Sequence, residues 1–246
     1  MNKYQHHFYP EIRFGGFSNI DGTISFYARI NSLLKKTDVV LDIGCGRGDY
    51  LHDPVGFRRD LRILKNKVAK VIGIDIDESA QTNPLVDEFR LIANSRWPID
   101  DASIDLAVGD FVLEHISDVD SFFSEVARVL RPNGYLCLRT CNKMSYFGLC
   151  VSLIPSRFHA KITQHVQDAR EEEDVFPTVY RCNTRGKIRR AMRLYGFDAA
   201  VCPYEAEPAY LNFSKLAYRL GVLHQRLAPM WAKPNLFVFG TKKRAA

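Results

Sequence analysis

The sequence predicts an α/β protein in which a mostly parallel sheet of seven strands carries helices on both faces. Short apolar runs alternate with stretches of helical periodicity, which is typical of parallel sheets covered by helices. The first run leads into a loop with three glycines spaced two apart, as in ligand-binding turns between a strand and a helix. A chain of 246 residues, 46% hydrophobic and 25% charged, is long enough to bury a single core.

The expected elements begin with a helix before the sheet. Its residues Phe26, Tyr27 and Ile30, with Leu33 and Leu34, recur at helical spacing and are expected to face the sheet. Seven apolar runs are then expected as strands, at 39–43, 70–75, near 89–92, 104–108, 135–140, 197–202 and 236–240.

The helix after the fourth strand has the clearest boundaries. Ser117 and Asp120 form a predicted capping box, in which side chains bind the free N–H groups of the first turn. Pro132–Asn133–Gly134 is expected to end the helix, and a further helix is expected over about 184–195. The apolar positions on one face are Val119, Phe122, Phe123, Val126 and Leu130.

The loop after the first strand carries most of the predicted chemistry. It contains Asp42, Gly44, Gly46 and Gly48, and glycine lets the backbone turn sharply and approach a ligand. A dinucleotide fingerprint would need a third glycine where Asp49 stands. At the end of the second strand, Asp75 is placed to accept both hydroxyls of a ribose. Together they predict a site for an adenosine cofactor, with a ligand-free glycine turn as the alternative.

Three more segments make the pattern resemble a known family. They are Trp97–Leu106, Phe111–Ile116 and Glu125–Gly134, and with the glycine loop they resemble the small-molecule branch of the class I S-adenosylmethionine-dependent methyltransferases. The resemblance covers about residues 37–141. It implies a Rossmann-like fold and S-adenosylmethionine as cofactor, with the methionine end over the glycine loop and the ribose at Asp75.

The resemblance also implies which residues contact the cofactor. Many relatives have an aspartate at the position of Ala93 to receive the adenine amino group, so Asn94 or backbone groups would replace it here. Tyr27 and Arg29 would meet the carboxylate of the cofactor, unless Tyr27 packs in the core and Arg29 is solvated. The expected contacts are Tyr27, Asp42, Gly44, Cys45, Gly46, Gly48, Asp75, Ile76, Asn94 and Asp110.

The composition indicates a cytoplasmic protein. The six cysteines form no C-x-x-C pair and no metal spacing, so neither disulfides nor a metal site is expected, and Cys45 is interpreted as a small filler of the loop. The chain has no apolar run long enough to cross a bilayer, and its start lacks the apolar part of a secretory signal. The net charge of +6 favours anionic partners without choosing among them.

The whole chain, 1–246, is expected to form a single methyltransferase domain. Residues 1–36 would form an N-terminal cap helix, 37–140 the cofactor-binding core, and 185–246 the C-terminal half of the sheet with a helical insertion. The segment 141–184 is long for a connection and rich in polar and aromatic residues, so it is expected to be a substrate cap. Its pattern loosely resembles methyltransferases found with bacterial surface-glycan and sugar-modifying enzymes.

Methyl transfer to a hydroxyl needs alignment of the acceptor and a base for its proton. The candidate catalytic residues are His115 and Asp110 after the fourth strand and His159 in the cap, with Tyr146 as a further candidate. His115 also suits a packing role, and transfer by alignment alone is another alternative. A magnesium-assisted mechanism is disfavoured because no metal spacing appears.

Three functions are compatible with these features. The preferred one is O-methylation of a sugar, glycan or other small molecule, with a lipid-linked glycan as one acceptor. The second is methylation of RNA or protein, favoured by the basic run 185–193, although no RNA-binding module accompanies it and a stable nucleic-acid partner is not expected. The third is a non-catalytic subunit that binds S-adenosylmethionine.

A second helical pattern lies near the C-terminus. Core packing is the preferred interpretation of its apolar face, while a homodimer contact and a peripheral membrane contact are the alternatives. The apolar positions are Leu216, Leu220, Leu223 and Leu227, with Lys215, Arg219 and Arg226 on another side.

Overall fold

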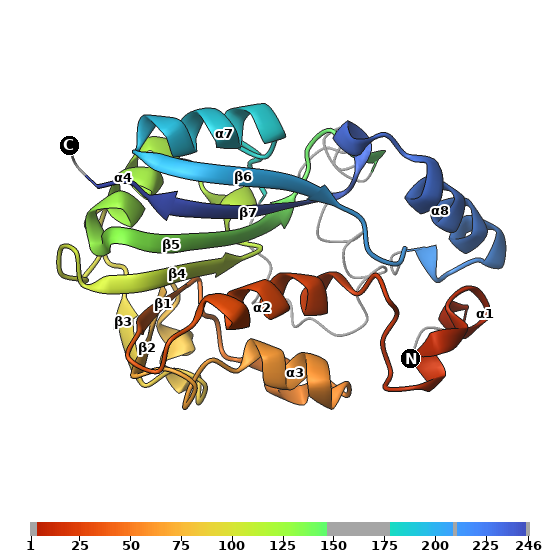
Figure 1. Cartoon of the computed structure of the whole chain (residues 1–246), viewed down its shortest axis with the longest axis horizontal. Helices are drawn as coiled ribbons and strands as arrows, with labels where there is room; N and C mark the ends of the chain where they lie inside the picture. Colours follow the sequence, from red (N-terminus) through yellow and green to blue (C-terminus); the bar gives the residue numbers. More distant parts are fainter. Residues whose placement is uncertain (1–3, 147–177, 209–210, 245–246) are drawn as a thin grey trace.

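The computed structural model describes residues 4–146, 178–208 and 211–244. Seven strands form one sheet in the order β3-β2-β1-β4-β5-β7-β6, and β7 runs antiparallel to both of its neighbours (Figure 1). The predicted mostly parallel sheet of seven strands is confirmed. The strands are β1 (Val39–Ile43), β2 (Lys70–Asp75), β3 (Glu88–Leu91), β4 (Ile104–Asp110), β5 (Leu130–Cys141), β6 (Phe197–Tyr204) and β7 (Asn235–Lys242).

Helices cover both faces of this sheet, as the sequence predicts (Figure 1). Successive residues of a strand point to opposite faces. In β1, Val40 packs in one apolar cluster with Phe26, whereas Leu41 packs in another with Phe123. The first cluster lies under α2 (Gly22–Leu33) and α3 (Gly56–Arg62), and the second under α4 (Val119–Val129) and α7 (Arg185–Leu194).

The boundaries of α4 differ from the predicted ones. The N-cap is Asp118, whose carboxylate accepts a hydrogen bond from the Ser121 amide at 2.9 Å, so the predicted capping box at Ser117 is wrong. The helix also ends before Pro132, because the chain enters β5 at Leu130. The register between β4 and β5 shifts at this point, and Pro132–Asn133–Gly134 lies within the irregular start of the strand.

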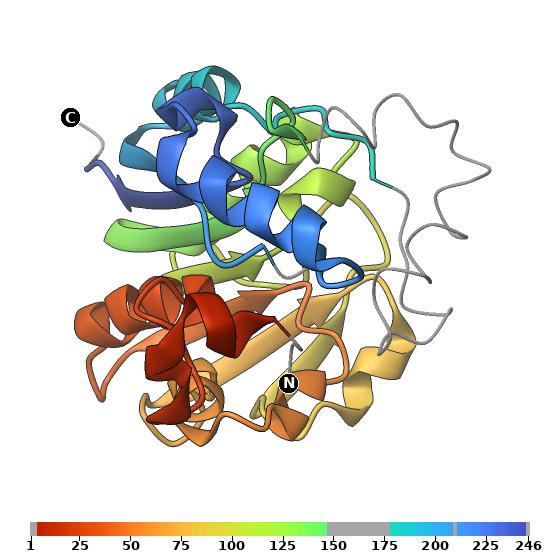
Figure 2. The ribbon, with the colours of Figure 1, turned by 90° about the vertical axis from the view of Figure 1, so that its right-hand side faces the viewer.

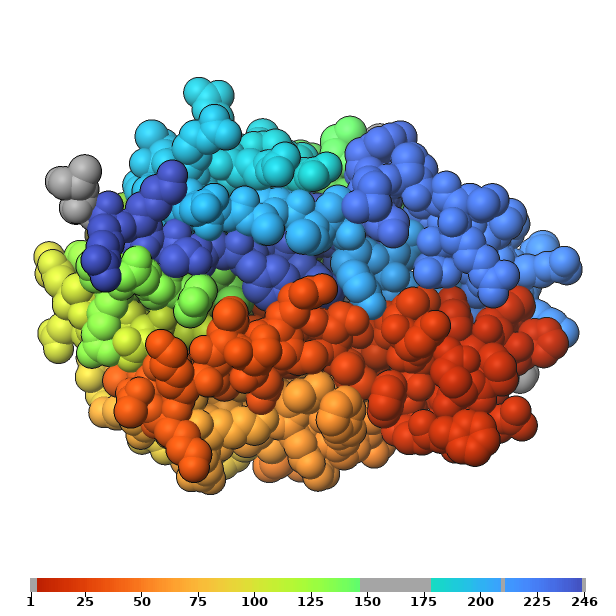
Figure 3. Space-filling model, in the orientation of Figure 1, coloured from red at the N-terminus to blue at the C-terminus, as the bar shows by residue number. Residues whose placement is uncertain are grey.

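The N-terminal segment and the C-terminal helix lie beyond the carboxyl ends of the parallel strands (Figure 1), and they lie next to each other in the views of Figures 2 and 3. Tyr218 of the helix is fully buried there, in one apolar cluster with Tyr9 and Ile12. None of the helices in the described ranges has the length and apolar character that a bilayer-spanning helix needs. The elements at this end are α1 (Gln5–Phe8), the 3-10 turn η1 (Pro10–Arg13) and α8 (Lys215–Leu227).

The leucines of α8 do not pack in the core, so the preferred interpretation of this helix is wrong. Tyr218, Gly221 and Val222 form its buried side, and the leucine face lies on the opposite side. The exposed fractions are 67% for Leu216, 57% for Leu220, 52% for Leu223 and 72% for Leu227.

Candidate functional site

The glycine loop between β1 and the turn at 49–52 leaves one side open. Gly44, Gly46 and Gly48 have φ angles of 67°, 51° and 81°, which residues with a Cβ rarely adopt. A Cβ on Gly44 would lie 2.6 Å from Val112, and one on Gly48 would lie 2.5 Å from Asn83. A Cβ on Gly46 would have nothing within 4 Å. Gly44 and Gly48 are therefore fixed by packing, whereas Gly46 borders space that a ligand can occupy.

Asp75 ties this loop to the end of β2. Its Oδ2 accepts a hydrogen bond from the Gly46 amide, and its Oδ1 accepts one from the Asp77 amide, both at 3.0 Å. A carboxylate oxygen has two lone pairs, so each oxygen retains capacity for a hydroxyl donor. The geometry is compatible with the predicted contact to a ribose. Ile76, the next residue, is 63% exposed and offers an apolar surface beside it.

Asn83 holds the loop from the other side and was not predicted. Its Nδ2 donates to the carbonyl oxygens of Cys45 at 2.9 Å and Gly46 at 3.1 Å, and its Oδ1 accepts from the Leu85 amide. The side chain of Cys45 is buried against Gly73, and burial raises the pKa of its thiol. The side chain of Cys45 therefore fills space, as expected, and only its backbone contributes to the surface of the loop.

Asp110, at the end of β4, is held in an ion pair. Nε and Nη2 of Arg139 lie 2.6 and 2.7 Å from its two oxygens, and the Tyr27 hydroxyl donates to Oδ2 at 3.1 Å. Burial alone would raise the pKa of Asp110, but the guanidinium of Arg139 holds it below its ordinary value. A carboxylate so strongly stabilised is a weak base, which disfavours the predicted catalytic role.

The pKa of Asp42 is shifted in the opposite direction to that of Asp110. Burial, with the nearby charges of Asp110 and Asp75, raises the pKa of Asp42 to about 7, while Arg62 opposes the shift. A cation bound beside Asp42 would relieve this repulsion. The site therefore favours a ligand that carries positive charge near the glycine loop.

Arg62 completes the cluster from α3. Its guanidinium lies 4.3 Å from the centre of the Tyr50 ring, and Nη2 is 3.8 Å from Oδ2 of Asp110. The Nε atom is buried and has no hydrogen-bond partner among the described residues. No sequence pattern links Arg62 to Asp110, so this residue was missed. Arg29, which the sequence offered as a partner of the cofactor carboxylate, is exposed and lies over the ring of Phe239.

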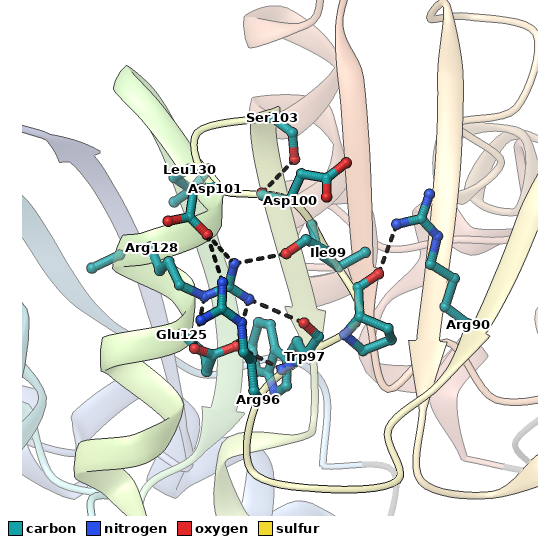
Figure 4. Close-up of polar contacts among 12 residues, drawn as sticks. Arg90, Arg96, Trp97, Ile99, Asp100, Asp101, Ser103, Glu125, Arg128 and Leu130 are labelled. Carbon is teal, nitrogen blue, oxygen red and sulfur yellow. Dashed lines mark hydrogen bonds and ion pairs between the residues drawn. The ribbon is translucent and has the colours of Figure 1, made fainter.

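The expected adenine side is anchored by Arg128 of α4. Figure 4 shows its guanidinium donating to the carbonyl oxygens of Trp97 and Ile99 and to the carboxylate of Glu125. These bonds hold the loop that follows Asn94 against α4. Oδ1 of Asn94 itself accepts from the Arg96 amide at 3.1 Å, so one lone pair of this oxygen is already engaged.

A family model described as a methyltransferase domain matches residues 17–200. The chain belongs to the class I S-adenosylmethionine-dependent methyltransferases. It is 35% identical over 112 residues to a Mycolicibacterium smegmatis protein named "Probable S-adenosylmethionine-dependent methyltransferase", across 44% of this chain and 39% of that protein. It is 33% identical over 116 residues to the Homo sapiens mitochondrial ubiquinone biosynthesis O-methyltransferase, across 42% and 29%. Both matches span less than half of the relative.

Solved structures of this family share the fold. The geranyl diphosphate C-methyltransferase of Streptomyces coelicolor, in complex with S-adenosyl-L-homocysteine, superposes with a TM-score of 0.53 at 16% identity, across 90% of this chain and 78% of that chain. S-adenosylmethionine is the cofactor of this methyltransferase, and the residues described above fit it. Gly46 leaves room for it, Asp75 has lone pairs for the ribose, and Asp42 and Arg62 offer opposite charges to the ammonium and carboxylate of its methionine end.

A cavity lies at the carboxyl end of β5, which ends at Cys141. Glu205 is buried in its wall, and Oε1 lies 2.7 Å from Nδ1 of His224 on α8. The second oxygen, Oε2, is buried without a hydrogen-bond partner among the described residues, and burial raises the pKa of Glu205. The rings of Tyr146 and His224 pack in a T-shaped arrangement, with centroids 4.7 Å apart. The lining residues are Cys141, Tyr146, Glu205, Ala206, Glu207, Pro208, Pro234 and Asn235.

Of the predicted bases, His115 and Asp110 are not among the residues that line this cavity, whereas Tyr146 is. His115 is partly exposed in the short turn 113–115 after β4, and its role stays a prediction. His159, with most of the expected substrate cap, lies outside the described residues. In the ranges that are described, no group of three or more His, Cys, Asp or Glu side chains is placed to hold a metal ion. Neither the sequence spacing nor a motif marks His224, so it was missed.

Proposed function

We propose that this methyltransferase acts on a hydroxyl oxygen of a small molecule held in the cavity, with His224 and Glu205 as the base. The observation that carries the proposal is the 2.7 Å pairing of Nδ1 of His224 with a buried carboxylate in the cavity wall. Such a pairing fixes the tautomer of an imidazole and stabilises the imidazolium that forms when the ring accepts a proton.

The position of the cavity agrees with this role. Cys141 of β5 pairs with Asn235 of β7, which in turn pairs with Tyr204 of β6, and all three lie at the edge where Asp110 ends β4. Neighbouring strands are about 4.8 Å apart, so the cavity starts about 5–10 Å from the end of β4. An acceptor there would lie next to a cofactor bound over the glycine loop.

The chemistry divides between the cofactor and the protein. When bound, S-adenosylmethionine supplies an already activated methyl group. The protein has to align the acceptor oxygen with it and remove the hydroxyl proton, and alignment supplies most of the acceleration. Nε2 of His224 would take the proton while Glu205 holds the opposite side of the ring.

The charge of the cavity supports a hydroxyl acceptor. Glu205 and Glu207 line it, and no basic residue does among the described residues. Carboxylates accept hydrogen bonds from hydroxyl groups and repel a phosphate. The O-methyltransferases of ubiquinone biosynthesis among the relatives act on oxygen by name. We include the sugar or glycan acceptor suggested by the sequence, and phenols, within this proposal.

The test is a methyl-transfer assay with labelled cofactor against separate pools of sugars, glycolipids, phenols and RNA. For the acceptor that is found, we expect His224→Asn and Glu205→Gln to lower kcat about 10²–10⁴-fold and to leave the cofactor affinity unchanged. The exposed His52, replaced by alanine, is the matched control. Full turnover in both variants, or transfer to RNA alone, would contradict the proposal. His115→Ala tests the predicted base in the same assay.

A further inference from the structure

The helix α8 has two apolar sides, and only one of them is covered. Tyr218, Gly221 and Val222 face the body of the protein, where a Cβ on Gly221 would lie 2.6 Å from Pro208. The leucines recur at three- and four-residue spacing, so they share the opposite side of the helix. All four are more than half exposed.

Exposed large apolar side chains also flank both ends of the helix in sequence. Phe213, just before the N-cap, is 76% exposed, and Trp231, in the turn that follows, is 62% exposed. Large exposed apolar patches on soluble proteins usually mark an interaction site. Leucines flanked by phenylalanine and tryptophan are typical of helices that lie in a membrane interface.

Basic residues border one edge of the leucine face. At 100° per residue, Lys215, Arg219 and Arg226 fall on the same side of α8, next to the leucines. None of them forms an ion pair within the described ranges 4–146, 178–208 and 211–244. From Pro208 to Ala246 the sequence contains no aspartate or glutamate. This helix therefore carries positive charge beside its apolar face, and none of it is engaged in an ion pair among the described residues.

We infer that α8 docks this methyltransferase on an anionic membrane surface. The leucines would enter the boundary between head groups and acyl chains, while the basic edge would contact lipid phosphates. A second copy of the chain suits this face less well, because its own α8 offers three more positive charges and no acid. The membrane supplies both the apolar volume and the opposite charge.

The same helix carries His224, whose Nδ1 pairs with Glu205 in the cavity wall. If the proposed function holds, docking through the leucines would bring the cavity to the membrane surface, where a hydroxyl on a lipid-linked acceptor can reach it. This step rests on the proposed function, whereas the docking itself does not.

The test is co-sedimentation with vesicles of phosphatidylcholine alone and of phosphatidylcholine and phosphatidylglycerol in equal parts. We expect binding to the anionic vesicles, with a loss of at least tenfold in Leu220→Glu and Leu223→Glu. The matched control is Leu194→Glu, because Leu194 is 71% exposed on α7 and lies outside this face. Replacing Arg219 with glutamine should weaken binding about fivefold on anionic vesicles and have little effect on neutral ones.

Two readouts separate this inference from its alternatives. The leucine variants should keep the thermal stability and cofactor affinity of the wild type, and His224→Asn should bind vesicles normally whether or not it retains turnover. Equal vesicle binding by the wild type and Leu220→Glu would overturn the inference. So would a wild-type dimer in sedimentation velocity that becomes a monomer in Leu220→Glu, because the face would then join two copies.

Discussion

Nδ2 of Asn83 donates a hydrogen bond to the carbonyl oxygen of Cys45 at 2.9 Å, across 38 residues of sequence. The same nitrogen reaches the carbonyl of Gly46, so this buried amide holds the glycine loop on the side opposite Asp75. Asn83 lies behind the loop and acts through it, as a positioning residue.

Replacing Asn83 with alanine should therefore weaken cofactor binding without removing a ligand contact. Each lost hydrogen bond is worth about 0.5–1.5 kcal/mol, and two carbonyls are released, so we expect an affinity loss of about tenfold. Isothermal titration with S-adenosylmethionine measures it, and Asn19→Ala, at an exposed position, is the control. Unchanged affinity would show that the loop keeps its shape without the amide.

Gly46→Val should abolish cofactor binding, because the side chain would enter the open space over the loop. The backbone at Gly46 has a positive φ, so the substitution also introduces strain. Gly196→Val controls for this, since Gly196 has a φ of 80° and equally open space but lies between α7 and β6. We expect both variants to lose similar thermal stability and only Gly46→Val to lose the cofactor. Wild-type affinity in Gly46→Val would place the ligand elsewhere.

The affinity for S-adenosylmethionine should depend on pH through Asp42. In the free protein the pKa of Asp42 is about 7, and a bound cation would lower it. Binding then releases a proton, so affinity should rise as the pH increases towards about 7 and level off above it. Titrations in buffers of different ionisation enthalpy count the released protons. Affinity that is independent of pH, with no proton release, would exclude Asp42 as the partner of the cation.

Asp42→Asn should stabilise the free protein while impairing its function. A carboxyl whose pKa is raised by folding destabilises the folded state as the pH rises from its ordinary pKa to the raised one. Above about pH 7 the variant should therefore melt at a higher temperature than the wild type, and near pH 4 the two should melt alike. Thermal melts without cofactor measure this. A lower melting temperature at alkaline pH would contradict the shift.

Arg62→Met should weaken cofactor binding about tenfold, because a buried Nε–H would no longer be available to the carboxylate of the cofactor. It should also move the pH at which affinity levels off upwards, since Arg62 holds down the pKa of Asp42. Arg59→Met, on the same helix but paired with Asp60 at the surface, is the control. A change in affinity without a change in the pH profile would show that Arg62 affects cofactor binding without affecting the pKa of Asp42.

The sequence predicted the sheet and the cofactor loop because both depend on local patterns. The runs that became β1 and β2, and the glycines after β1, are recognisable from neighbouring residues alone. Asn83, Arg62 and His224 act across long sequence separations, so no local pattern marks them.

The leucines of α8 show a different limit of prediction from sequence. Periodicity identifies the face formed by Leu216, Leu220, Leu223 and Leu227, but Tyr218 and Val222 make the opposite side apolar as well. Only the position of Tyr9 and Ile12 in the fold decides which side is covered. The cap of α4 was misplaced for a related reason, since Ser117 and Asp118 are both good N-cap residues and stand next to each other.

Because β7 lies between β5 and β6, the strands cannot pair in the order in which the ribosome makes them. β6 is an edge strand whose sheet neighbour is β7, so it has nothing to pair with until residues 235–242 have emerged. Before then the nascent chain already contains β1 to β5, the glycine loop, Asp75 and Arg62. Domains generally fold as units. The sheet can therefore be completed only after β7 has left the ribosome, and the cavity wall, which includes Pro234 and Asn235, is completed with it.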